Sequence, residues 1–126
     1  MTKRNDDIHW LPQPEAHDYP AAAAYLGLLY DDASVAPIIE RLRQAPAAEF
    51  KAKDIFRASA LALLGISNSH VEKNLRKIEL GTALSPLLLV RVPQHAKLIV
   101  ADGYHRLCAV YTCNEDAVIP VRIVSL

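Results

Sequence analysis

The residues of this chain best suited to chemistry form one short run, Asp102-Gly103-Tyr104-His105-Arg106, directly after the apolar segment 98–101. An Asp-Gly turn that opens a helix brings together unpaired backbone N–H groups and the positive end of the helix dipole, and both favour an anion. His105 and Arg106 add an imidazole and a guanidinium, which donate hydrogen bonds to anionic oxygen. The run therefore predicts a site for phosphate.

Each residue of the run has a physical reason to be there. Gly103 permits a positive φ and lets a phosphate approach the backbone. Asp102 could cap the helix, hold Arg106 or a metal ion, or act as a base, so Asp102 and His105 are the candidate catalytic residues. A structural alternative needs no ligand, because Asp102 could cap the helix while Arg106 pairs with a surface acid and His105 packs.

A second, weaker pair of candidates lies on the helix expected before the sheet. Ser69-His70-Val71-Glu72 is typical of a capping box, and Val71, Leu75, Ile78 and Leu80 form an apolar stripe that stops at Gly81. Lys73 and Lys77 share the exposed side of this helix, one turn apart. Lysines on a solvated helix face are ordinary, so the sequence by itself favours a structural role for both.

The second half of the chain is expected to form the sheet. Leu87–Val92 and Lys97–Ala101 are short apolar runs separated by residues 93–96, which predicts two strands and a turn. A helix over 104–113 follows, and a closing strand over 118–124, where Pro120 favours an edge strand or the start of a strand.

The first half is expected to be helical. Residues 1–17 are polar and contain Pro12 and Pro14, which predicts an extended arm with Trp10 and Leu11 as an anchor. The chain from 18 to 126 is then one α+β domain, helical over 18–80 and sheet-rich over 81–126, with a small mixed sheet. The expected helices are Ala21–Tyr30, a second from Ser34 to Ala45, and Ala58–Leu64 ending at Gly65, whereas Lys51–Phe56 fits either a strand or the entry to a helix.

Composition limits the classes of function. The 126 residues are 52% apolar, which suffices for the core of one domain, and 14 basic residues balance 14 acidic ones. A neutral chain has no long-range field to draw it to nucleic acid or an anionic membrane. There is no secretory signal and no apolar stretch of membrane-spanning length, so we expect a cytoplasmic protein that does not enter the membrane. The five histidines lack metal-ligand spacing, and no metal site is predicted.

The second half resembles the ParB/sulfiredoxin superfamily, in particular the ParB N-terminal-like domain, over roughly residues 69–124. The resemblance lies in the order of its parts: a helix ending at Gly81, the strand entry 85–90, the turn 99–103, the segment Tyr104-His105-Arg106-Leu107-Cys108-Ala109, and a strand after Ile119-Pro120. It implies a similar fold with an added helical N-terminal portion.

The resemblance also implies a ligand. In relatives the glycine turn and the following His-Arg pair hold the phosphates of ATP, ADP or CTP, which implicates Gly103, His105 and Arg106, with Asp102 and Tyr104 as neighbours. A nucleotide with Mg²⁺ is the expected cofactor, and hydrolysis or phosphoryl transfer stays open. Sulfiredoxins have a reactive cysteine directly before the His-Arg pair. Tyr104 occupies that position here, which argues against sulfinic-acid repair.

Two other classes of function compete. Residues 58–78 resemble a helix-turn-helix in which Asn68, His70, Lys73 and Asn74 could reach the major groove of DNA, although the neutral net charge weakens this reading. A regulatory or interaction module that keeps the turn only for structure is the third class. The apolar helix expected over residues 20–30 leaves a homodimer open.

Overall fold

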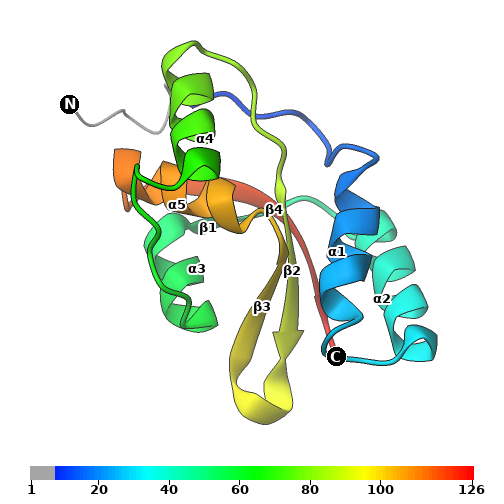
Figure 1. The fold of residues 1–126 in the computed structure, drawn as a ribbon. Coiled ribbons are helices and arrows are strands. Elements are labelled where there is room, and N and C mark those ends of the chain that lie inside the picture. Colours follow the sequence, from blue (N-terminus) through cyan, green and yellow to red (C-terminus); the bar gives the residue numbers. More distant parts are fainter. Residues whose placement is uncertain (1–7) are drawn as a thin grey trace.

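The computed structural model describes residues 8–126 and shows an α+β fold in which helices cover both faces of one mixed sheet (Figure 1). In chain order the elements are α1 (Asp18–Leu26), α2 (Asp32–Gln44), β1 (Ala48–Lys51), α3 (Ala52–Ser59), α4 (Ser69–Glu79), β2 (Leu87–Val92), the short 3₁₀ helix η2 (Pro93–His95), β3 (Lys97–Asp102), α5 (Tyr104–Cys113) and β4 (Val118–Ser125).

The four strands lie in the order β1-β4-β2-β3. β4 pairs with β1 in the antiparallel and with β2 in the parallel direction, and β2 and β3 form an antiparallel hairpin. The strand pair predicted over 87–92 and 97–101 is thus confirmed, and α5 confirms the helix predicted over 104–113. β4 is a central strand, so the edge position that Pro120 suggested is wrong. The proline is tolerated because the pairing with β2 begins only at Val121, one residue later.

Alternation along β2 divides the core in two. Leu87 and Leu89 join the cluster under α3, α4 and α5, whereas Leu88 and Val90 join the cluster under α1 and α2. Strands buried on both faces are continuously apolar, which explains the uninterrupted run Leu87–Val90. This three-layer packing fixes the end of β3, and with it the turn at Gly103, as part of a rigid frame.

The N-terminal arm is anchored as expected. Trp10 forms a bridge with Leu84, Leu11 N–H donates to the Leu84 carbonyl at 2.8 Å, and Ile8 is buried. The part of the predicted arm over residues 1–7 lies outside the described residues. Within residues 8–126, no helix combines the length and apolar character needed to cross a membrane.

The connection between α3 and α4 differs from the expectation. Helix 58–64 does not form: α3 ends at Ser59, Ala60 adopts a left-handed conformation, and residues 61–65 have no regular structure. Gly65 therefore ends no helix. The capping residue of α4 is Asn68, whose side chain accepts hydrogen bonds from the N–H groups of His70 and Val71, and not Ser69 as the capping box predicted.

Two further expectations on apolar residues are corrected. The first helix ends at Leu26, and Leu28 is 83% exposed, so the predicted helix Ala21–Tyr30 is too long. Leu80 is 75% exposed and does not continue the buried stripe of Val71 and Ile78. Both exposed leucines lie just beyond the last helical turn, where the helical period no longer applies.

Candidate functional site

The candidate site begins at the turn between β3 and α5. Gly103 has a φ of 105°, in the left-handed region, and an added Cβ would lie 2.7 Å from Leu87 Cγ. The first hydrogen bond of α5 runs from Leu107 N–H to the Gly103 carbonyl at 2.9 Å, and no side chain among residues 8–126 caps the helix. The N–H groups at the start of α5 thus lack a side-chain acceptor, which is the arrangement that suits an anion.

Helix α4 closes a polar cavity over this turn, with a volume of about 240 Å³. We call it the turn cavity. Figure 1 shows α4 beside α5, above the start of that helix. The cavity brings together the whole predicted phosphate site, both weaker lysine candidates and three of the four candidate DNA contacts. Its lining consists of His70, Lys73, Asn74, Lys77, Asp102, Gly103, Tyr104, His105 and Arg106.

The lysines of α4 give the turn cavity its positive charge. Within residues 8–126, neither Lys73 nor Lys77 forms an ion pair. Arg76, on the same helix, is by contrast paired with Glu72 at 2.9 Å. The structure therefore places two unpaired ammonium groups opposite the open N-terminus of α5, which the helical pattern of the sequence could not reveal.

Arg106 is held by the protein to a greater extent than the sequence indicated. Its Nη2 donates to Asp102 Oδ2 at 2.9 Å and to the Pro86 carbonyl at 3.3 Å. The two side chains are only 17% and 15% exposed, and the buried Arg106 Nε has no hydrogen-bond partner among the described residues. Arg106 thus lines the turn cavity and at the same time braces the end of β3 against α5. Of the roles considered for Asp102, holding Arg106 is the one observed.

A second carboxylate lies behind Asp102. Asp18, on α1, is buried, and its carboxylate accepts hydrogen bonds from Ser85 Oγ and from Glu15 N–H. Burial raises the pKa of Asp102, the Arg106 guanidinium opposes this, and the neighbouring Asp18 raises the pKa further. Sequence reasoning missed Asp18 and Ser85, because an Asp in the first turn of a helix carries no sign of a partner 67 residues away.

Two imidazoles lie side by side in the turn cavity. The ring centroids of His70 and His105 are 4.8 Å apart, and Tyr104 packs against His105 at 5.5 Å. The Tyr104 hydroxyl donates to the Ala62 carbonyl at 2.5 Å, which ties the α3–α4 connection to α5. Burial lowers the pKa of His105, and the neighbouring His70 and Arg106 lower it further. At neutral pH the imidazole of His105 is therefore mostly uncharged.

This lowered pKa gives a testable sign. A bound anion favours the charged imidazole, so sulfate is expected to raise the pKa of His105, and by linkage sulfate binds more tightly as pH falls through the titration range of His105. The other charged or titratable groups around His105 are His70, Lys73 and Lys77 from α4 and Asp102, Tyr104 and Arg106 from its own turn.

NMR titration of the imidazole signals with and without sulfate measures the change in the pKa of His105. His95, in the distant β2–β3 hairpin, is the control, and an unchanged pKa at His105 would contradict the site.

The geometry does not support the helix-turn-helix. Residues 60–68 separate α3 from α4 without forming the first helix of that motif. Asn68 caps α4, and Asn74 Nδ2 donates to the His70 carbonyl at 2.8 Å, so both amides are used locally. His70 and Lys73 line the turn cavity, where they face α5. Helix α4 therefore forms one wall of the turn cavity, and the first helix that the motif requires over 58–64 is not formed.

The donor set of the turn cavity does not fit a protein-built metal site. Mg²⁺ prefers several oxygen ligands, and the only carboxylate in the lining is that of Asp102, which is paired with Arg106. No group of three or more His, Cys, Asp or Glu side chains suited to a metal ion occurs in the described part of the chain. The expected Mg²⁺ would therefore have to arrive with the phosphates of a nucleotide.

No family model, curated protein or solved structure matches this chain.

Proposed function

We propose that the turn cavity binds the phosphate groups of a nucleotide, with ATP, ADP and CTP as the candidates that the ParB/sulfiredoxin resemblance names. One observation carries this proposal: unpaired Lys73 and Lys77 on α4 face the uncapped N-terminus of α5 across a cavity of about 240 Å³. Lysine ammonium groups and the first N–H groups of a helix bind phosphate through the same two effects, opposite charge and hydrogen-bond donation.

Each part of the site has a distinct task in this proposal. The backbone N–H groups after Gly103 donate to phosphate oxygens, and Lys73 and Lys77 neutralise the charge of the ligand. His105 donates from a ring nitrogen and becomes a stronger partner when protonated. Arg106 keeps the turn in shape through Asp102 and forms part of the cavity wall.

Asp102 is engaged by Arg106, so a role as general base requires that this ion pair open. His105 lines the cavity, and burial lowers its pKa, which favours the neutral imidazole that a base requires, so it is the better-placed base for a phosphoryl transfer or a hydrolysis. A search for nucleotide turnover in the His105→Asn variant beside the native protein separates the two candidates.

The two lysines provide the sharpest test of binding. We expect Lys73→Ala and Lys77→Ala each to weaken ATP or CTP binding by about tenfold, the loss of roughly one charge-assisted hydrogen bond. Isothermal titration calorimetry with ATP, ADP, CTP and inorganic pyrophosphate measures the affinities, with adenosine as the phosphate-free comparison.

Lys97→Ala is the matched control, because it removes the same charge at the opposite end of β3 and leaves the turn cavity intact. A native protein that binds none of these compounds, or equal losses in all three variants, would refute the proposal. The first outcome would favour the regulatory module that keeps the turn only for structure.

A further inference from the structure

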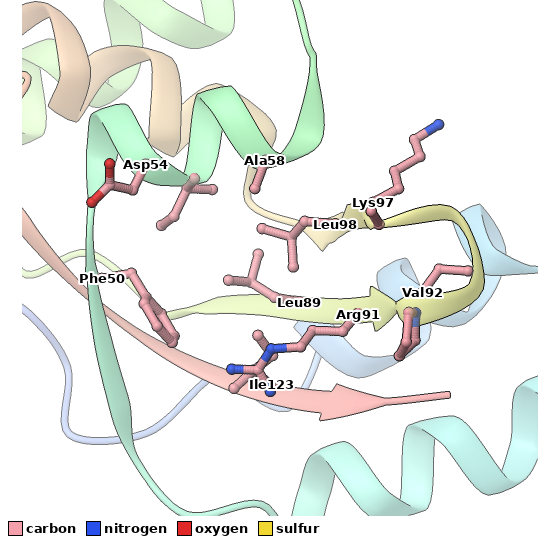
Figure 2. Close-up of a pocket in the computed structure, with 12 residues that line it drawn as sticks. Phe50, Asp54, Ala58, Leu89, Arg91, Val92, Lys97, Leu98 and Ile123 are labelled. Carbon is pink, nitrogen blue, oxygen red and sulfur yellow. The ribbon is translucent and has the colours of Figure 1, made fainter.

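A second cavity lies on the sheet face that α3, α4 and α5 cover, at the end away from Gly103. Its volume is about 350 Å³, and we call it the distal pocket. Figure 2 shows it between α3 and the β2–β3 hairpin. Every strand contributes to its wall. Its apolar lining includes Phe50, Ile55, Ala58, Leu89, Leu98 and Ile123.

The distal pocket exists because the helical layer is incomplete here. On this face, α4 and α5 cover the sheet near Gly103, whereas toward the hairpin α3 lies over β3 and lines the pocket with Asp54, Ile55 and Ala58. Leu89 of β2 and Ile55 of α3 line opposite sides of the pocket and are 0% and 2% exposed. Because both side chains are held in a closely packed core, a small movement of one side chain cannot close the hollow.

One cation without a carboxylate partner lies at this apolar hollow. The guanidinium of Arg91 lies beside Phe50 and Ile123 in Figure 2, with its Cζ 6.0 Å from the centre of the Phe50 ring. Its Nη1 donates a long hydrogen bond of 3.4 Å to Ser125 Oγ. Arg91 forms no ion pair within residues 8–126.

The other two charged residues of the lining do not compete with Arg91. Asp54 is paired with Arg57 at 3.6 Å, and the ammonium group of Lys97 points away from the pocket in Figure 2. The distal pocket is therefore an apolar hollow with one available guanidinium beside it. This combination discriminates against fully polar ligands through its walls and against cations through its charge.

We infer that the distal pocket binds an amphipathic monocarboxylate, with an aliphatic or aryl body of about eight carbons among Leu89, Leu98 and Ala58 and its carboxylate on the Arg91 guanidinium. Guanidinium and carboxylate match in a planar, two-bonded geometry, which makes Arg the appropriate partner for this head group. Cavities of roughly 300–1,000 Å³ commonly hold small ligands. The site is separate from the turn cavity and does not depend on its function.

The experiment is an NMR titration of the ¹⁵N-labelled protein with octanoate, octan-1-ol and acetate. Octanoate is expected to shift the amide signals of residues 54–58, 89–92 and 96–98 with the strongest affinity. Octan-1-ol should bind at the same place about tenfold more weakly, and acetate should not bind, because each buried methylene contributes about fourfold.

Two variants test the separate parts of the inference. Arg91 is exposed, so the substitution Arg91→Gln is not expected to disturb the fold. It should weaken octanoate binding about tenfold and leave octan-1-ol binding unchanged. Ala58→Phe fills the hollow and should abolish binding of both. Lys73→Ala should leave both ligands unaffected.

Four outcomes would overturn the inference: no binding of octanoate, equal affinities for octanoate and octan-1-ol, equal octanoate affinity in native protein and Arg91→Gln, or signal changes centred on Gly103 in place of the hairpin. If Ala58→Phe fails to fold, which its ¹⁵N spectrum would show, the comparison of octanoate and octan-1-ol in Arg91→Gln still decides.

Discussion

Gly103→Ala is expected to lower the free energy of unfolding by about 2–4 kcal/mol, which combines the cost of a positive φ in a residue with a side chain and the cost of overpacking. Both terms have a visible origin. Gly103 has a φ of 105°, and its new methyl carbon would lie 2.7 Å from Leu87 Cγ and 3.0 Å from Arg106 Nη2. Leu87 is fully buried and cannot move aside. The strain therefore falls on the turn that positions the start of α5.

A matched control is present in the same chain. Gly65 has no positive φ, and an added Cβ there meets no atom within 4 Å. Gly65→Ala should thus change stability by less than about 1 kcal/mol, within the range of a change in the unfolded state alone. Urea unfolding of the two variants at neutral pH measures the difference. Equal stability of Gly103→Ala and native protein would show that the turn is not constrained as described.

The same variant links the fold to the candidate site. Arg106 Nη2 is one of the atoms that the new methyl group would press, so the Asp102–Arg106 bridge must shift with it. Gly103→Ala should accordingly weaken nucleotide binding under conditions where the protein is still folded. Gly65→Ala should not.

Local sequence patterns sufficed for those elements whose boundaries depend on local chemistry. The change from a helical to an alternating or continuous apolar pattern at Ser85 predicted β2 and β3, and the Asp-Gly pair predicted the turn into α5. β1 was not predicted, because Ala48–Lys51 carries two charged residues among four, and the ambiguous segment Lys51–Phe56 is helical from Ala52 onward. β1 is a strand because β4 offers it an antiparallel partner, which is a tertiary effect.

The segment after α3 shows how tertiary contacts override local preference. Ala58–Leu64 is rich in good helix formers and was predicted to be helical. In the structure the helix stops at Ser59, and the Tyr104 hydroxyl donates a hydrogen bond to the Ala62 carbonyl in the irregular segment that follows. No local pattern encodes a hydrogen bond to a residue 42 positions away.

The residues of the candidate site differ in the same way: some can be identified from local sequence, and others depend on tertiary packing. The five residues 102–106 are contiguous and could be selected from the sequence, and Lys73 and Lys77 could be noted only as exposed lysines. Their approach to the turn depends on how α4 packs on α5, and the contact of Asp18 with Ser85 depends on how α1 packs on the sheet. Residues that complete a site from distant elements give no signal in a single sequence.

Arg106→Ala is expected to reduce the free energy of unfolding by about 3 kcal/mol at pH 7, because removal of one partner from a mostly buried ion pair leaves the other charge without compensation. The Asp102 carboxylate, which is 15% exposed in the native protein, would lose its cationic partner and remain next to the buried Asp18. The lost contact to the Pro86 carbonyl adds to the cost. Chemical denaturation at several pH values measures the effect.

The pH dependence of this variant has a defined sign. The pKa of Asp102 is already raised by burial, and the Arg106 guanidinium is the largest influence that opposes the rise. Without it the pKa of Asp102 rises further in the folded state, so the folded protein binds a proton more readily than the unfolded chain. A raised carboxyl pKa stabilises the fold below the ordinary value and loses that contribution as pH rises through the folded value. The deficit of Arg106→Ala should therefore be small near pH 4 and largest at neutral pH.

Asp102→Asn separates loss of the ion pair from loss of packing. The neutral amide keeps the shape of the carboxylate and removes the buried charge, so the double variant Asp102→Asn/Arg106→Ala should be more stable than Arg106→Ala at pH 7, by about 1–2 kcal/mol, the cost of an unpaired buried polar charge. The gain should vanish near pH 4, where Asp102 is protonated in the single variant. A double variant that is as unstable as Arg106→Ala at both pH values would show that Arg106 stabilises the turn by packing alone. The unpaired charge of Asp102 would then cost no free energy of unfolding.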